Sequence, residues 1–112
     1  MRLQVVFFRM QSGNEPVREW LKSLSADDKR IIGEDIKTVQ FGWPIGMPVV
    51  RKIETGIWEV RSSLKNRIAR VLFTFEGNYM VLLHGFIKKS PKTSLEDLKL
   101  ARERLLRLRG ER

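Results

Sequence analysis

The sequence lacks cysteine, and it also lacks long apolar runs. With no cysteine among 112 residues, the chain has no disulfide framework and no thiolate metal site, which is typical of proteins in a reducing cytosol. No apolar stretch approaches the roughly 20 residues that a membrane-spanning helix needs. The apolar residues 3–8 are too few for the core of a signal peptide and are followed at once by Arg9. We therefore expect a cytoplasmic protein that does not use a membrane.

Acidic residues are also in short supply. Against 22 Lys and Arg stand 13 Asp and Glu, which gives a net charge of +9 and a pI near 10.5. Between Arg51 and Lys92, nine cations face only three anions. Such a balance favours an acidic partner: nucleic acid, an anionic membrane or an acidic protein. The chain length and the ordinary hydrophobic share of 42% predict one folded domain, residues 1–112.

Short apolar runs with turn-forming residues between them predict a sheet. Residues 57–60, 68–75 and 79–87 are such runs, which predicts consecutive antiparallel strands. Gly77 and Asn78 have the composition of a two-residue hairpin turn. Residues 49–53 add a further strand. Residues 3–8 are almost wholly apolar, so we expect a strand buried on both faces, beside this meander rather than at its edge.

Helical patterns stand before and after these strands. Pro16 and the apolar spacing that follows it predict a first helix, and Ser25 is the expected N-cap of a second helix that ends near residue 41. Thr93 and Glu96 form a capping-box pattern at the start of a last helix. The order is β-α-α-β-β-β-β-α. We expect an α+β fold with a mainly antiparallel sheet, a helical hairpin on one face and a C-terminal helix.

Several chemically active side chains lie on the predicted strands. Alternation places His84 and Phe86 on one face with Met80 and Leu82. Aligned in a sheet, the residues expected to converge on the side left open by the helices are Arg61, Arg70, His84, Phe86 and Lys88. Cations there would stabilise charge on an RNA phosphate, and an aromatic ring would stack on a base. His84 has the near-neutral pKa that suits acid or base catalysis.

Each of these residues has an ordinary structural alternative. A lone histidine between Leu83 and Gly85 is more often a core residue than a catalyst. Arg61 beside Glu59 fits a simple ion pair, and the lysines from Lys88 onward fit a solvated loop. With one histidine, no cysteine and no carboxylate cluster on the basic strands, we expect no metal and no cofactor.

Three segments carry a resemblance to a known family: W-E-V-R (58–61), R-I-A-R-V-L-F (67–73) and L-L-H-G-F-I-K-K-S-P-K-T (82–93). With them the chain resembles the RelE/ParE toxin superfamily, most closely its phage-derived, HigB-like branch of RelE-type toxins, over nearly its whole length. The resemblance implies a small RelE-like fold. It implies the toxin of a type II toxin–antitoxin system, a ribosome-associated, metal-independent endoribonuclease (mRNA interferase). The implied partners are mRNA, the ribosome and a cognate helix-turn-helix antitoxin.

The resemblance also implies roles for individual residues. Arg61 matches the strand arginine near the scissile phosphate, and the expected catalytic set is Arg61, Arg70, His84 and Lys89. The expected RNA-binding set is Arg51, Lys52, Arg67, Phe86, Lys88 and Lys92. The tyrosine that some RelE enzymes use in the C-terminal helix is absent, and Leu95 lies near that point. His84 or a lysine is therefore the expected acid or base.

Two other functions would use the same features. A ParE-like relative would share the fold and inhibit gyrase through protein contacts. A non-catalytic nucleic-acid-binding module would need the charge but not its geometry. The density of cations on the strands at 57–61, 67–73 and 80–89 favours the nuclease over both.

Overall fold

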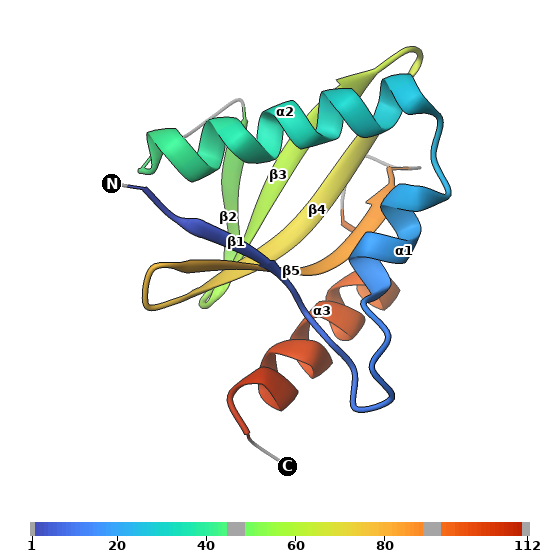
Figure 1. Ribbon diagram of the computed structural model, residues 1–112. Helices are drawn as coiled ribbons and strands as arrows, with labels where there is room; N and C mark the ends of the chain where they lie inside the picture. Colours follow the sequence, from blue (N-terminus) through green and yellow to red (C-terminus); the bar gives the residue numbers. More distant parts are fainter. Residues whose placement is uncertain (1, 45–48, 89–92, 111–112) are drawn as a thin grey trace.

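The computed structural model describes residues 2–44, 49–88 and 93–110. Its elements are β1 (Gln4–Phe7), α1 (Pro16–Lys22), α2 (Ala26–Gly42), β2 (Val50–Glu54), β3 (Ile57–Leu64), β4 (Arg67–Glu76), β5 (Tyr79–Ile87) and α3 (Leu95–Leu108) (Figure 1). The predicted α+β class and element order are confirmed. No helix within the described residues is long and apolar enough to cross a membrane.

The five strands form one sheet in the order β1-β5-β4-β3-β2. The strands β2 to β5 are an antiparallel meander, whereas β1 pairs in parallel with β5. The expectation that this first strand avoids the edge is wrong, because β1 is an edge strand. It is half-buried because helices lie over it: α1 contacts it, and Leu3 N donates to Gln40 O of α2 at 2.9 Å. An apolar run indicates that a strand is buried, but helices can bury it as well as neighbouring strands can.

Tight turns set the register of the meander. Gly77 has a φ of +61° and joins β4 to β5, and Glu76 pairs with Tyr79 across the turn, so the predicted hairpin is confirmed. Asn66, with a φ of 59°, lies in the equivalent turn between β3 and β4. Asparagine and glycine tolerate this left-handed conformation better than other residues do.

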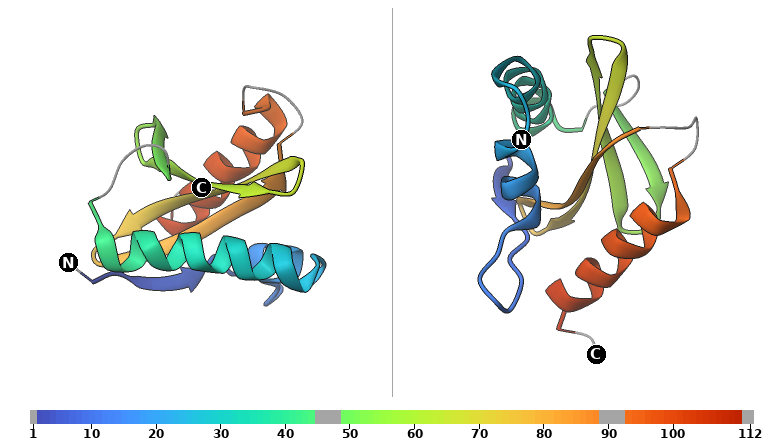
Figure 2. Two further views of the ribbon diagram at one scale, coloured as in Figure 1. Left: turned by 90° about the horizontal axis from the view of Figure 1, so that it is seen from above. Right: turned by 90° about the vertical axis from the view of Figure 1, so that its right-hand side faces the viewer.

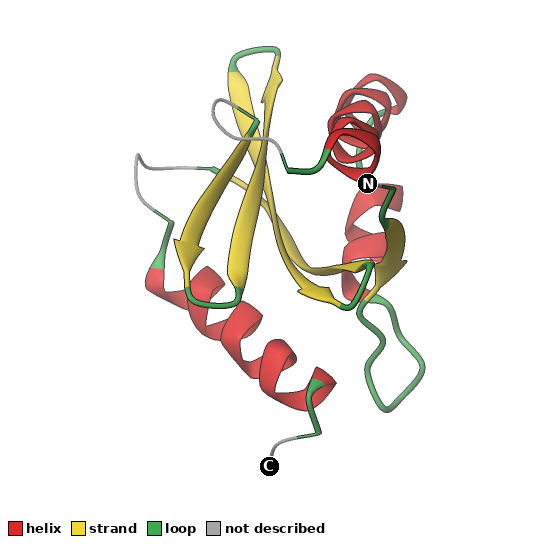
Figure 3. Ribbon diagram, turned by 90° about the vertical axis from the view of Figure 1, so that its left-hand side faces the viewer, coloured by secondary structure: helices red, strands yellow, loops and turns green. Residues whose placement is uncertain are grey.

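Helices lie on both faces of the sheet. The hairpin of α1 and α2 covers one face, here called the hairpin face, and α3 packs across the other, here called the α3 face (Figures 2 and 3). Core residues divide accordingly: Ile32 and Val71 belong to the hairpin-side cluster, and Leu72, Leu83 and Ala101 to the cluster beneath α3. The side that was expected to stay open is therefore partly covered by α3.

A β-bulge in β5 changes which residues share a face. Leu72 pairs with His84 but the next residue, Phe73, pairs with Leu82, so Leu83 is an extra residue in β5. Met80 and Leu82 accordingly join the hairpin-side core, while Leu83 joins the core beneath α3. The prediction that His84 shares a face with Met80 and Leu82 is wrong, because one inserted residue reverses the alternation.

Side-chain caps begin the two long helices. Ser25 Oγ accepts a hydrogen bond from Asp28 N at 3.2 Å, as predicted for α2. In α3 the N-cap is Ser94, whose Oγ accepts from Asp97 N at 3.1 Å, rather than the predicted Thr93. The cap lies one residue later because the Thr93 hydroxyl bonds to side chains of the sheet.

Candidate functional site

The strand register aligns the polar residues of the α3 face in two rows. In one row Arg51 pairs with Glu59, which pairs with Leu72 of β4 and through it with His84. In the next row, Arg61 pairs with Arg70, and Arg70 with Phe86. Directly paired residues in an antiparallel sheet place their side chains on the same face. The predicted convergence of these strand residues on one face is therefore observed.

A buried ion pair lies at the centre of these rows. Arg70 and Glu59 are only 2% and 1% exposed, and Arg70 NH1 donates to Glu59 Oε2 at 3.0 Å. Thr93, just before α3, accepts from Arg70 at 3.1 Å and donates to Glu59 at 3.3 Å. The Nε atom of Arg51 is 3.9 Å from the other carboxylate oxygen of Glu59. Arg70 is thus held beneath the surface, where its charge acts on its surroundings through the low-dielectric interior.

More cations lie above this pair. The pKa of Lys88 is lowered, first by partial desolvation and then by the positive charges of Arg70 and Arg61. Glu59 opposes this shift, and Arg51 adds to it. Among the residues that the structure describes, these are the charges close enough to influence the ammonium group. We call Arg51, Arg61, Arg70 and Lys88 the basic cluster. A single carboxylate does not neutralise it, so it favours an anionic ligand such as a phosphate.

Backbone hydrogen bonds fix two cations at the surface of the cluster, Arg61 in β3 and Lys88 just after β5. Arg61 N donates to Val49 O at 2.9 Å, which holds β3 beside the segment before β2. Lys88 N donates to Ile68 O at 2.7 Å, so the pairing with β4 continues one residue past the end of β5. Both side chains therefore project from paired strands, which hold a site more rigidly than a free loop would.

His84 lies on the α3 face but is turned toward α3. Its Nε2 is 2.6 Å from Asp97 Oδ1, its Nδ1 is 3.4 Å from the Arg104 guanidinium, and its ring stacks on Phe86 with centroids 5.4 Å apart. Burial lowers the pKa of His84, the hydrogen bond to Asp97 opposes that shift, and Arg104 adds to it. Both ring nitrogens contact protein groups, and the catalytic role expected for this residue stays a prediction.

Two predicted RNA-binding residues are not brought to the basic cluster. The Nζ of Lys52 lies over the ring of Trp58, 5.6 Å from its centroid, and Trp58 packs against the hairpin-side core. The NH2 of Arg67 is 2.5 Å from Asp28 Oδ2 of α2. Both residues therefore lie on the hairpin face. Side chains an odd number of residues apart in a strand point to opposite faces, and Lys52 is one residue from Arg51 while Arg67 is three residues from Arg70. Lys89 and Lys92 lie outside the described residues.

Sequence reasoning missed the residues that hold the cluster together. The sequence predicts Glu59 only as a surface partner of Arg61, yet it is buried against Arg70. The sequence predicts a helix cap at Thr93 and no role for Asp97 or Arg104. One signal was available for Glu59, because it is two residues from Arg61 and therefore on the same strand face. Nothing local in the sequence links Thr93 or Asp97 to the sheet.

A comparison with protein families places the chain in one of them. The model of the family described as phage derived protein Gp49-like (DUF891) matches residues 19–106, most of the chain. The chain belongs to this family. The Gp49-like family belongs to the RelE/HigB toxin-like group, which is the level at which the resemblance noted above is supported. The match includes the whole basic cluster and leaves β1 outside. No curated protein matches the chain.

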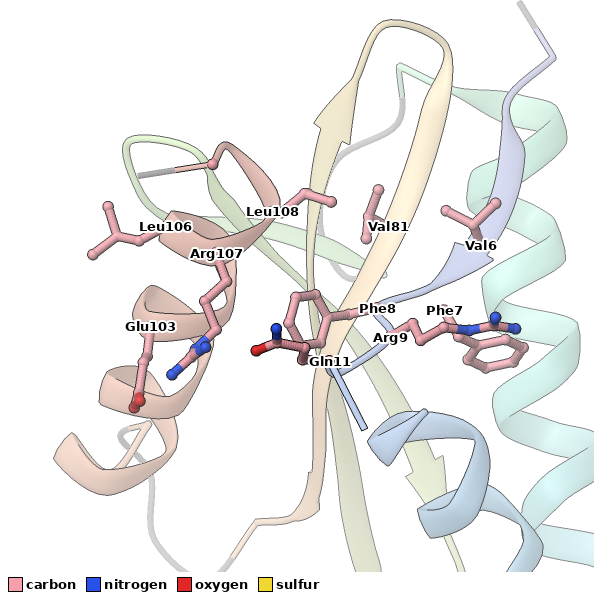
Figure 4. A pocket seen from close by; sticks show the side chains of 11 residues that line it. Val6, Phe7, Phe8, Arg9, Gln11, Val81, Glu103, Leu106, Arg107 and Leu108 are labelled. Carbon is pink, nitrogen blue, oxygen red and sulfur yellow. The ribbon is translucent and has the colours of Figure 1, made fainter. Parts of the chain in front are cut away.

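The Gp49-like chain also has a groove at the other end of α3. It measures about 800 Å³ and lies between β1 and the C-terminal half of the helix (Figure 4). Phe8 and Val81 are buried at its base, Leu106 is exposed on one wall, and Arg9 and Arg107 line opposite sides. The groove does not contain the basic cluster. An anionic substrate is therefore better matched by the cluster than by this groove.

The described part of this Gp49-like chain has no group of three or more His, Cys, Asp or Glu side chains placed to hold a metal ion. The charged chemistry of the α3 face comes from arginine and lysine, with Glu59 beneath them. Such a surface can bind a phosphate and stabilise added negative charge on it.

Proposed function

We propose that this protein is the toxin of a type II toxin–antitoxin system and that it cleaves mRNA, on the ribosome, as a metal-independent endoribonuclease. The observation that supports this most is the basic cluster, in which Arg51, Arg61 and Lys88 surround a buried Glu59–Arg70 pair. The membership of a Gp49-like family within a toxin-like group supports it as well.

The cluster suits attack by an RNA 2′-hydroxyl on the adjacent phosphate. In that step the 2′-oxygen forms a bond to phosphorus and loses its proton, while the 5′-oxygen leaves and takes up a proton. The products are a 2′,3′-cyclic phosphate and a 5′-hydroxyl end. The phosphate carries more negative charge in the transition state than in the ground state. Arg61 and Arg51 at the surface, with Arg70 beneath, would stabilise that additional charge.

A lysine is the acid or base that this geometry supports best. Partial desolvation, together with the neighbouring Arg70 and Arg61, lowers the pKa of Lys88, so its neutral amine is more accessible near pH 7 than that of an ordinary lysine. His84 is engaged on both nitrogens by α3, so the proposal does not use it as acid or base. Phe86 lies beside Arg70 in the sheet and would offer a ring face to an unpaired base.

The experiment that tests the proposal measures mRNA cleavage directly. Expression of the toxin without its antitoxin should stop growth, and primer extension on a translated message should show new 5′ ends that persist with EDTA under conditions that keep ribosomes intact. Arg61→Ala should slow cleavage roughly 100- to 1000-fold, because about 3–4 kcal/mol of transition-state stabilisation is lost. Growth arrest with intact messages and accumulating DNA breaks would instead support a gyrase inhibitor.

Binding gives a second test that separates the cluster from general charge. RNA affinity should fall steeply with salt because each phosphate contact releases counterions. Arg61→Ala and Lys88→Ala should weaken binding and flatten that salt dependence. Lys22→Ala and Lys29→Ala are matched controls, since these lysines are exposed on α1 and α2. Equal effects at all four positions would mean that only net charge matters.

A helix-turn-helix antitoxin is the proposed partner. The net charge of +9 favours an acidic contact surface on such a protein. Where the neighbouring gene encodes a helix-turn-helix protein, co-expression with that protein should restore growth and yield a stable complex. If the two proteins co-purify but growth stays arrested, that protein is not the inhibitor.

A further inference from the structure

The single histidine of the chain joins β5 to α3. Its Nε2 is 2.6 Å from Asp97 Oδ1, and its Nδ1 is 3.4 Å from NH1 of Arg104. The same NH1 donates to Leu83 O at 2.8 Å, which fixes the guanidinium beside the ring. The His84 side chain is 14% exposed. The ring therefore lies between a carboxylate and a guanidinium, with little access to solvent.

These two neighbours determine where the proton resides. An arginine side chain donates hydrogen bonds, accepts none and stays charged in proteins. The Nδ1 atom that faces Arg104 must then present its lone pair, and the proton resides on Nε2, where it is donated to Asp97. A second proton on Nδ1 would point at the guanidinium and bring two positive charges together.

We propose that His84 is a positioning residue: as the neutral Nε2–H tautomer it ties α3 to β5 and so holds Thr93 on the Glu59–Arg70 pair. That this role serves the cleavage site rests on the proposed function, whereas the tautomer of His84 and its attachment of α3 to β5 do not. His84 acts through Asp97 and Thr93 and does not contact the substrate.

The tie reaches the basic cluster through the start of α3. Asp97 holds His84 with Oδ1, while its Oδ2 accepts from the hydroxyl of Ser94, the N-cap. The residue before the cap is Thr93, which bonds to both Arg70 and Glu59. The beginning of α3 is thus attached to β5 through His84 and to β3 and β4 through Thr93. Loss of the His84–Asp97 contact should let Thr93 shift relative to Arg70 and Glu59.

The pH dependence follows from the same contacts. Within the described residues, the charged groups that face the ring are Asp97 and Arg104, both from α3, and the ring of Phe86 stacks on it from β5. Burial lowers the pKa of His84 in the folded protein. The unfolded chain then binds the proton more readily, so this contribution to stability is complete above the ordinary histidine pKa of about 6.5. It declines as the pH falls from there toward the lower folded pKa.

NMR spectroscopy on the ¹⁵N-labelled protein tests the tautomer without any RNA, because the chain has one histidine. We expect a neutral Nε2–H pattern at pH 7 and a titration midpoint below 6.5. A neutral Nδ1–H ring, a doubly protonated ring at pH 7, or a midpoint at or above 6.5 would overturn the proposal.

Two variants test the positioning role. His84→Gln keeps a donor for Asp97 and an acceptor for Arg104, whereas His84→Leu keeps neither. We expect the Thr93 methyl resonance to shift in His84→Leu and to stay near its original position in His84→Gln. Cleavage should stay within about threefold of wild type in His84→Gln and fall at least tenfold in His84→Leu.

The outcomes separate this proposal from the proposed function. A folded His84→Gln variant that loses cleavage 100-fold, with its RNA affinity and Thr93 resonance unchanged, would make His84 an acid or base and overturn the positioning role. An unmoved Thr93 resonance in folded His84→Leu would overturn it as well. If the wild-type protein cleaves no message, the proposed function fails, while the tautomer and the Thr93 resonance still decide whether the tie exists.

Discussion

Replacing Glu59 with glutamine should destabilise the protein far more than removing a surface carboxylate does. Glu59 and Arg70 are 1% and 2% exposed and are joined at 3.0 Å. The substitution keeps the size of the side chain but leaves the Arg70 charge buried without its counterion. Breaking a buried pair in this way costs about 3–5 kcal/mol. We expect about 3 kcal/mol here, because the glutamine oxygen can still accept a hydrogen bond from Arg70.

Thermal unfolding is the assay. In a domain of this size, each kcal/mol lowers the Tm by roughly 4 °C, so Glu59→Gln should lower it by roughly 12 °C. The matched control is Glu34→Gln on α2, because Glu34 and its partner Arg30 are about 60% exposed. Exposed pairs at this helical spacing contribute about 0.3–0.5 kcal/mol.

The double variant Glu59→Gln/Arg70→Met separates loss of charge pairing from loss of packing. With the buried cation gone as well, it should be less destabilised than Glu59→Gln alone. Two results would refute the reasoning. One is a Glu59→Gln variant that is no less stable than Glu34→Gln. The other is a double variant whose loss of stability equals the sum of the losses in the Glu59→Gln and Arg70→Met single variants.

The remaining predictions concern the two faces of the sheet. Lys52→Ala and Arg67→Ala should leave RNA affinity within about twofold of wild type in a salt-matched binding assay, since both side chains lie on the hairpin face; a loss as large as that of the cluster variants would contradict this. Gly85→Ala should cost about 1–3 kcal/mol, because the new methyl group would lie 2.3 Å from the Trp20 ring. Gly33→Ala, with open space in α2, should stabilise the protein by about 0.5–1 kcal/mol; denaturant titration measures both glycine variants.

The local elements of this fold were predictable because their causes are local. Apolar periodicity marked the strands and helices, and a glycine and an asparagine marked the β4–β5 turn, where φ is positive. Ser25 was identified as an N-cap from its position before two acidic residues. Strand alternation also placed Arg61 and Arg70 on one face, which pairing across β3 and β4 confirms.

The tertiary structure decided which charges meet. Arg70 and Glu59 are charged residues that a sequence pattern assigns to the surface, yet both are buried, and Thr93 just before α3 forms hydrogen bonds with both. The extra residue Leu83 in β5 separates His84 from the face of Leu82. Neither result follows from periodicity within one strand.

The sequence by itself determined the elements, their order, their turns and the basic character of the central strands. These depend on propensity and spacing over a few residues. The edge position of β1, the bulge in β5, the placement of α3 over the basic rows and the contacts of His84 depend on pairing between distant segments. The basic cluster and the Glu59–Arg70 ion pair beneath it depend on burial and on hydrogen bonds between residues far apart in the sequence, and a local pattern does not contain that information.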